Sequence, residues 1–206
     1  HVCDPTDPLT QQRVLEVHPQ ASVTMPPLPL SAPEIPWIDP RRVHFVLRWR
    51  VAIGAAPSVD GWTRELLLPL LQDETCLLGV TRILVSILNG RLSVNTQQRL
   101  LTVGLICLAK NGTNAQQCIR PIAPESLWLR LAGHLVLHMV EDTIPSFLSE
   151  HQFGIGKGTE RAVHCIRHAM QQQDTRLLVC LDMRNAYNSI HRSTVLRRIY
   201  ETEELK

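Results

Sequence analysis

Proline placement constrains the fold of this chain more than any other feature of its sequence. Proline fixes one backbone dihedral and lacks an amide hydrogen, so it interrupts both helices and sheet ladders. Residues 1–36 are therefore predicted to form a proline-rich extended arm or linker. Eight of the 14 prolines of the chain lie in this segment: Pro5, Pro8, Pro19, Pro26, Pro27, Pro29, Pro33 and Pro36.

A helix is predicted to begin at Asp39-Pro40, because an Asp cap followed by Pro at the first helical position is typical of a helix start. Its apolar residues Val43, Val46 and Leu47 share one side. After a loop at 54–61, two further helices are predicted over 62–72 and 75–90, the second with Gly90 as its C-terminal cap. Residues 37–100 are therefore predicted to be a helical layer. Its first helix also carries four basic residues: Arg41, Arg42, Arg48 and Arg50.

From about Leu101 the pattern changes from helical to mixed. Residues 102–110 and 117–122 are predicted to be the two strands of a hairpin, with Lys110 and Arg120 flanking its tip. The predicted fold class is therefore α+β. Beyond the hairpin the pattern predicts a helix from Pro124 to about Val140, a glycine-punctuated loop at 151–158, a helix over 159–173, an apolar strand over 176–183 and a helix from near His191.

Composition and charge limit the class of protein. The chain has 206 residues, 44% of them hydrophobic, which is enough for one domain with a sizeable core or for a domain with an appendage. A formal net charge of +2 implies that any nucleic-acid surface is local. No apolar run approaches the ~18 residues that a membrane span needs, so we expect no membrane partner. Because the chain begins with His1 and not Met, we expect it to be a piece of a longer protein.

The cysteines and two other patterns favour ordinary structural roles. The six cysteines include no Cys-x-x-Cys pair, which predicts reduced thiols in an intracellular protein. The glycine-rich segment 154–160 lacks the Ser or Thr that follows Lys in a phosphate loop, since Lys157 precedes Gly158. Two histidine pairs with helical spacing lack the Glu of a zinc-protease helix: His134–His138 and His164–His168.

Asp182 has the position of a functional residue. It comes at the end of a predicted apolar strand, where sheet proteins place ligand and metal groups. Mg²⁺ is bound through one or two such carboxylates together with substrate phosphates. The alternative is that Asp182 caps the next helix or begins a turn.

The stretch LDMRNAYNSIHR around Asp182 resembles the first palm motif of reverse transcriptases, especially those of non-long-terminal-repeat (non-LTR) retrotransposons. Three upstream segments are similar to other parts of the same enzymes, in the same order. They are APSVDGWTRELL at 56–67, LICLAKNGTNAQQCIRPI at 105–122 and EHQFGIGKGTERAVH at 150–164. The resemblance covers about residues 38–206. It implies a fingers and partial palm architecture over 101–206, with a partial antiparallel sheet backed by helices, and the start of the fingers within 37–100.

The resemblance also implies roles for individual residues. Asp182 matches the first catalytic, metal-binding Asp, and the carbonyl of Met183 would be a secondary metal ligand. Tyr187 matches the aromatic ring that excludes a 2′-hydroxyl from the sugar site. Lys110 and Arg120 match the fingers residues that hold the incoming triphosphate, a role that suits two cations at a hairpin tip. The loop near the template matches two more residues: Gln152 and Gly154.

The second acidic motif of these polymerases lies well downstream of their first, and no paired aspartates follow Asp182 here. The chain is therefore expected to be inactive alone. The intact parent enzyme would use Mg²⁺, deoxynucleotides, an RNA template and a DNA primer, inside the cell and in the nucleus. We expect self-association through an exposed palm edge.

Two other functions remain open on the sequence. The chain could be a domesticated remnant that binds RNA or a protein partner without chemistry. It could also be an unrelated interaction domain, in which Asp182 caps a helix and does not converge with Lys110 and Arg120. A hairpin tip facing the cleft that contains Asp182 and Tyr187 would favour the polymerase.

Overall fold

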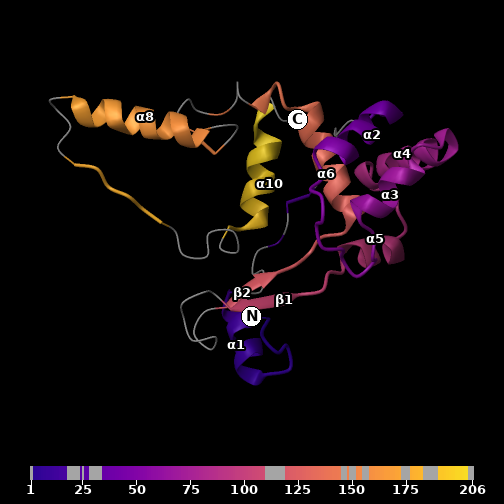
Figure 1. Ribbon diagram of the computed structural model, residues 1–206, viewed down its shortest axis with the longest axis horizontal. Coiled ribbons are helices and arrows are strands. Elements are labelled where there is room, and N and C mark those ends of the chain that lie inside the picture. Colours follow the sequence, from indigo (N-terminus) through magenta and orange to yellow (C-terminus); the bar gives the residue numbers. More distant parts are fainter. Residues whose placement is uncertain are drawn as a thin grey trace. The chain divides into compact units, whose positions relative to one another are not determined.

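The computed structural model describes residues 2–17, 24, 26–27, 34–109, 119–144, 148, 152–154, 158–172, 177–182 and 190–203 (Figure 1). The chain divides into two compact units, His1–Met139 and Val140–Lys206, and each is described by itself. The sequence pattern places boundaries after residues 36 and 100 instead, and these stay predictions. In the described part of the chain, no helix has both the length and the apolar character to cross a lipid bilayer.

The elements of the first unit are α1 (Pro8–Val17), α2 (Pro40–Trp49), α3 (Arg64–Leu70), α4 (Glu74–Leu88), α5 (Val94–Leu101), β1 (Ile106–Ala109), β2 (Ile119–Ile122) and α6 (Leu127–Met139). Those of the second unit are α8 (Gly158–Gln171) and α10 (Arg192–Glu201). Mixed helix and antiparallel sheet confirm the predicted α+β class.

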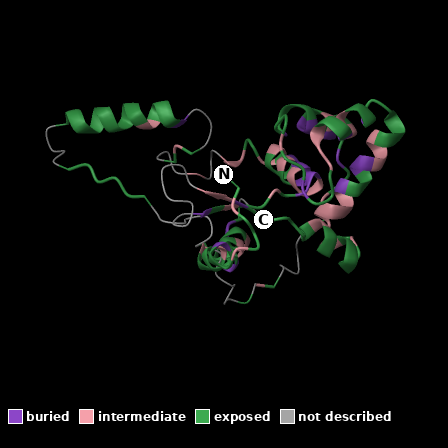
Figure 2. Cartoon of the chain, turned by 60° about the horizontal axis from the view of Figure 1, so that its bottom comes forward, coloured by how far each residue is buried: buried purple, intermediate pink, exposed green. Residues whose placement is uncertain are grey.

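The core of the first unit lies where α2, α4 and α6 pack against one another, with α3 against α2. On α6, Leu127, Leu131 and Leu135 recur at the i, i+4 spacing that aligns side chains on one helix face, and all three are fully buried. The predicted inward face of α2 is confirmed, because Val43, Val46 and Leu47 are buried as well. Figure 2 shows buried segments, in purple, within the helices of the first unit, whereas α8 is exposed along almost its whole length.

The helix ends follow local chemistry that can be read in the sequence. Asp39 accepts a hydrogen bond from the Arg41 amide at 2.9 Å, with Pro40 at the first helical position, so the predicted start of α2 is confirmed. At α4, the Cys76 amide donates to the Asp73 carboxylate at 2.8 Å, and this bond lowers the pKa of Asp73 below its ordinary value. The cap at α5, formed by Ser93, starts a helix that the sequence pattern did not predict.

Gly90 ends α4 as predicted, in a Schellman arrangement. Its φ of 65° lies in the left-handed region, which glycine adopts without steric cost. Its amide donates to the Ile87 carbonyl at 3.1 Å, and the Arg91 amide donates to the Ser86 carbonyl at 2.9 Å. The chain therefore turns sharply at the end of α4.

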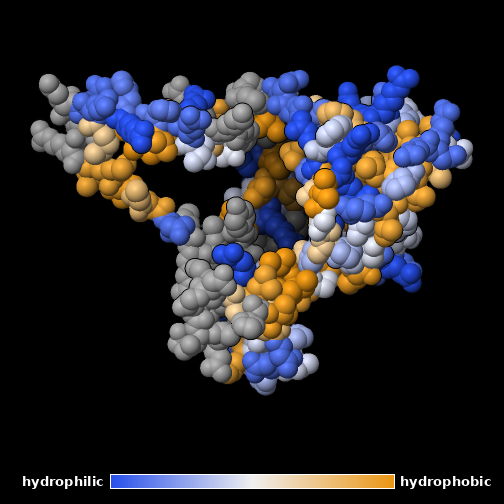
Figure 3. Space-filling view, in the orientation of Figure 1, coloured by the Kyte–Doolittle hydropathy of each residue, from blue (hydrophilic) through white to orange (hydrophobic). Residues whose placement is uncertain are grey.

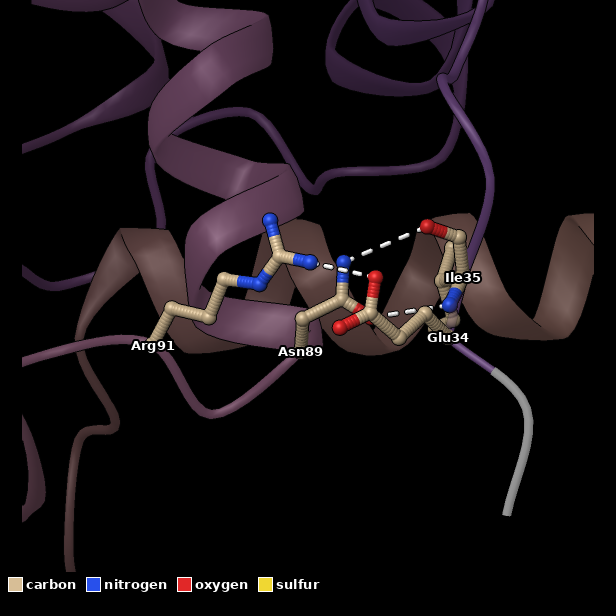
Figure 4. A network of polar contacts seen from close by, with 4 residues as sticks. All are labelled: Glu34, Ile35, Asn89 and Arg91. Atoms are coloured by element: carbon tan, nitrogen blue, oxygen red, sulfur yellow. Dashed lines mark hydrogen bonds and ion pairs between the residues drawn. The ribbon is translucent and has the colours of Figure 1, made fainter. Parts of the chain in front are cut away.

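Beside this turn, the Asn89 side chain holds the segment that enters α2 (Figure 4). The Ile35 amide donates to Asn89 Oδ1 at 2.8 Å, and Asn89 Nδ2 donates to the Ile35 carbonyl at 3.2 Å. An exposed ion pair between Arg91 and Glu34 flanks the two bonds. One side-chain amide thus satisfies both backbone groups of a residue 54 positions away, just before Ile38 enters the core.

The predicted hairpin is confirmed as an antiparallel pair of strands, with Ile106 opposite Ile122 and Leu108 opposite Arg120. Alternate residues of a strand face opposite sides. Cys107 therefore shares one face with its partner Pro121, and Arg120 lies on the other. Helix α1 packs against β2.

The prediction that residues 1–36 are extended throughout is wrong for α1. Pro8 stands at the first helical position, where its missing amide hydrogen costs nothing, and the next proline is Pro19. Asp7 then caps the helix by accepting from the amide and the hydroxyl of Thr10. The residues before α1 are also paired with β1, because Val2 forms an antiparallel bridge with Leu108.

The prediction of an apolar strand before Asp182 is not met by the described residues 177–182, which form no strand. Strand backbone groups need hydrogen-bond partners on a neighbouring strand, and the described part of the chain pairs none with this stretch. Its apolar side chains are exposed, Leu181 by 88% (Figure 3). Helix α6 also differs slightly: it begins at Leu127, not Pro124, because the Ser126 hydroxyl accepts from the Trp128 amide there.

We predict that Asn89→Ala lowers the free energy of unfolding by about 1–2 kcal/mol, because it removes two hydrogen bonds and leaves the half-buried Ile35 backbone without these partners. Chemical denaturation measures the change. Asn95→Ala is the matched control, since Asn95 is exposed on α5. Its effect should stay within about 0.5 kcal/mol. Equal effects from both substitutions would contradict the role of the Asn89 amide.

Candidate functional site

Arg120 lies on the open face of the hairpin. Its strand alternates in burial, with Ile119 buried and Arg120 and Ile122 exposed. The opposite face, which carries Cys107, borders a cavity lined largely by residues of α1. Helix α1 therefore covers one face of the hairpin, and the Arg120 guanidinium lies on the other face.

Lys110 is expected to act together with Arg120 in the predicted triphosphate site. It directly follows β1 but lies outside the described residues, as does the turn after it. The antiparallel register of the strands brings the end of β1 beside the start of β2, since Ala109 is opposite Ile119. The residues that precede Lys110 and Arg120 are therefore paired with each other, while the position of the Lys110 side chain stays a prediction.

Asp182 is exposed at the end of the irregular stretch 177–182. Met183 and Tyr187 lie outside the described residues. Among the residues that the structure describes, no three His, Cys, Asp or Glu side chains are grouped so as to hold a metal ion. Asp182 is suited to be one ligand of a hard cation, which takes oxygen donors from carboxylates, water and phosphate.

Arg120 and Asp182 belong to different compact units. The predicted approach of the hairpin tip to Asp182 and Tyr187 therefore stays a prediction.

Gln152 and Gly154 form a small turn that leads toward α8. The Gln152 side-chain oxygen accepts from the Gly154 amide at 2.8 Å, which closes a loop around Phe153. The guanidinium of Arg161, on α8, lies 5.9 Å from the centroid of the Phe153 ring, within cation–π range. The bond folds the Gln152 side chain back on its own backbone, while its predicted contact with a template stays untested.

Gly158 fixes how this turn meets α8. A Cβ at position 158 would lie 1.9 Å from the carbonyl oxygen of Phe153, a distance that no side chain tolerates. Only glycine lets the first turn of α8 approach the Phe153 backbone so closely. The sequence signal for this approach is the cluster of glycines at 154–158.

The loop that contains the APSVDG segment is fastened to the start of α6. The Ser126 hydroxyl donates to Asp60 Oδ2 at 2.5 Å, and Arg130 donates to the Ala56 carbonyl at 3.3 Å. A second oxygen of the Asp60 carboxylate accepts from the Trp62 amide at 3.2 Å. Sequence reasoning singled out this loop but missed its partners Ser126 and Arg130, because their contacts span more than 60 positions.

The outer face of α2 combines cations with exposed aromatic rings. Arg41, Phe45 and Arg48 follow helical spacing on the side opposite the buried valines, and Trp49 lies beside them. The Arg48 guanidinium lies 5.2 Å from the centroid of the Trp49 ring. Phe45 stacks on His138 of α6, with ring centroids 5.4 Å apart. Helix α2 contains no acidic residue, so this α2 outer face is a local basic surface.

Comparison with known proteins finds a similarity that covers most of the chain. Over 180 residues the chain is 36% identical to the retrotransposable element SLACS 132 kDa protein of Trypanosoma brucei gambiense. The match includes 87% of this chain and 15% of that protein, so the chain spans about a seventh of its relative's length. The similarity supports the conclusion that this chain derives from a retrotransposon. No protein-family model and no solved structure matches the chain.

We predict that Gly158→Ala loosens the first turn of α8, because the added methyl group displaces the Phe153 carbonyl. The expected cost is about 1–3 kcal/mol, measured as faster amide hydrogen exchange in the first half of α8. Gly133→Ala in α6 is the control, since its Cβ would meet nothing within 4 Å. That helix should gain about 0.5–1 kcal/mol. Unchanged exchange in α8 of the Gly158 variant would refute the close approach.

Proposed function

We propose that this chain is the fingers and early palm of an RNA-directed DNA polymerase of the non-LTR retrotransposon type. The observation that carries the proposal is the similarity to a retrotransposable element protein over 180 residues. A continuous stretch of that length in a chain of 206 residues contains residues 27–180 wherever it begins. It therefore includes the three upstream segments whose order is typical of these enzymes.

In this proposal the hairpin binds the incoming nucleotide. Arg120 is exposed on the hairpin face that α1 leaves open, where its planar guanidinium can donate two hydrogen bonds to one phosphate. Lys110, the residue that follows β1, would add a second positive charge. Such cations stabilise the negative charge that is redistributed when a phosphoryl group is transferred.

Asp182 would hold Mg²⁺ in the longer enzyme, with the Met183 carbonyl as a secondary ligand. The metal supplies electrophilic activation of the phosphate when it is bound. Tyr187 would exclude a 2′-hydroxyl, and Gln152 and Gly154 would lie near the RNA template strand. Phosphoryl transfer with two metals needs further carboxylates, so the active protein is one in which more acidic residues join Asp182.

Primer extension on an RNA template tests the proposal. The protein used is the longer enzyme of the proposal, in which residues 1–206 are joined to the residues encoded after Lys206. We predict that Asp182→Asn lowers the extension rate on the order of 100-fold or more, because it removes a charged metal ligand. Asp142→Asn is the control, an exposed aspartate of the same unit, and should retain the full rate.

Arg120→Ala should mainly raise the KM for deoxynucleotides, as expected for a residue that binds the triphosphate. If the protein extends no primer, or extends it equally well with Asn at position 182, the polymerase proposal fails.

A second candidate function is binding of single-stranded RNA without chemistry, and the α2 outer face favours it. Arginines that neutralise backbone phosphate, next to rings on which bases can stack, are the usual elements of such surfaces. The charge is concentrated there although the whole chain carries only +2. A binding surface of this kind is equally compatible with a polymerase that must hold its template.

We predict that Arg41→Gln/Arg48→Gln weakens binding of the chain to a single-stranded RNA and reduces the slope of log K against log salt by about 1.4, or ~0.7 for each lost phosphate contact. Fluorescence anisotropy over a salt series measures both quantities. Arg82→Gln/Arg99→Gln makes the same change in net charge at exposed positions on α4 and α5 and serves as the control. An equal loss of RNA affinity in the two double variants would assign the binding to net charge and overturn the role of the α2 outer face.

Asp182→Asn separates the two candidate functions. RNA binding without chemistry leaves affinity unchanged in this variant and gives no primer extension in any version of the protein. The polymerase gives extension that this substitution abolishes.

A further inference from the structure

Two cysteines far apart in the sequence lie directly opposite each other in the first unit. Val2 pairs with Leu108 in an antiparallel bridge, so the next pair along the two strands is Cys3 and Cys107. The Cys3 amide donates to the Cys107 carbonyl at 2.7 Å, which fixes this register. The N-terminal segment therefore adds to the edge of β1 that β2 does not occupy.

The backbone geometry of this pair is compatible with a disulfide. Residues opposite each other in an antiparallel ladder project their side chains from the same face. Hydrogen-bonded pairs have Cα atoms about 5.5 Å apart, within the range of about 4.4–6.8 Å that disulfides span. The two sulfur atoms can thus be joined by side-chain rotation and a small approach of the strands.

The surroundings of the two thiols differ. Cys107 is only 4% exposed and borders the cavity that α1 residues such as Thr10 and Val14 help to line. Cys3 is half-buried, so a small molecule in solution can reach it first. Burial, with a smaller contribution from neighbouring Cys3, raises the pKa of the Cys107 thiol. Cys3 is therefore suited to react first and Cys107 to react second.

We propose that Cys3 and Cys107 form a reversible intramolecular disulfide when the chain meets a low-molecular-weight disulfide such as oxidised glutathione. The Cys3 thiolate attacks one sulfur of the small disulfide, forms a mixed disulfide and releases one small thiolate. The Cys107 thiolate then attacks Cys3 Sγ, which breaks the mixed disulfide and releases the second small thiolate. The two protein thiols lose one proton each, and the two released thiolates take them up, so the protein is oxidised and the small disulfide is reduced.

The bond would fasten the N-terminal segment to the hairpin. Without it, the described contacts between this segment and the β1 edge are one bridge and one backbone hydrogen bond. A disulfide between positions 3 and 107 closes a long loop, and cross-links over long loops restrict the unfolded chain most. Oxidation would therefore hold α1 on its face of the hairpin and raise the midpoint of thermal unfolding, while Arg120 stays on the open face.

The test uses a full-length chain that keeps only these two cysteines, through Cys76→Ser, Cys118→Ser, Cys165→Ser and Cys180→Ser. It is incubated with oxidised glutathione at low protein concentration, and intact mass and peptide mapping are then recorded. We expect the monomer to lose the mass of two hydrogen atoms, to yield one linked peptide pair containing Cys3 and Cys107, and to return to the reduced form with dithiothreitol.

A register control keeps the number of thiols constant. In the same background, Cys3→Ser/Val2→Cys moves the thiol by one position, to the residue bridged to Leu108, whose side chain lies on the opposite face of the ladder. This variant should stop at mixed glutathione adducts, and its thermal midpoint should not rise on oxidation. Equal cross-linking in both variants, or adducts alone in the Cys3 protein, would overturn the proposal.

The unsubstituted chain gives a second measurement that does not depend on the four serine substitutions. Its non-reducing peptide map should contain the link between Cys3 and Cys107 before any link to the exposed Cys76, Cys165 or Cys180. Raising the pH should speed the second step, because more of the buried Cys107 is then a thiolate. A map dominated by links among the exposed cysteines would refute the proposal.

Discussion

The leucine stripe of α6 is the constraint on which the first unit depends. Leu127, Leu131 and Leu135 have no exposed surface, and each such side chain contributes roughly 1.5–3 kcal/mol by leaving water. Because α2 and α4 both pack on α6, the stripe also sets where their outer surfaces lie. The same helix anchors the APSVDG loop through Ser126 and Arg130. One buried face thus positions both a motif of the proposed polymerase and the basic α2 outer face.

The hairpin shows how a minimal sheet acquires two different faces. An isolated two-stranded ribbon is marginally stable, so it needs a covering layer. Here α1 supplies that layer on the Cys107 face, and the segment with Val2 and Cys3 pairs with the edge of β1. This leaves Arg120 exposed on the face that α1 does not cover. The proline-rich start of the chain is therefore, in part, a structural element of the hairpin.

Local signals explain why much of the helical layer and hairpin could be predicted. Asp39-Pro40 and Gly90 act over two to five residues, and each does locally what its residue type favours. The predicted strand before Asp182 is not found in the described residues 177–182, because a strand exists only when another strand satisfies its backbone. Of the candidate site, the exposure of Arg120 was foreseeable from strand alternation. The close approach at Gly158 and the clamp by Asn89 were not, since each depends on a backbone segment brought to it by folding.

The sequence by itself determined the α+β class, the start of α2, the end of α4, the antiparallel hairpin and an order of motifs that resembles that of retrotransposon reverse transcriptases. All of these follow from residue types at short, fixed spacing. Only the tertiary structure decided which residues meet across long separations: Asn89 with Ile35, Ser126 with Asp60, Phe45 with His138 and Cys3 with Cys107. The physical reason is that burial and long-range pairing depend on the whole chain, whereas caps and turns depend on a few neighbouring residues.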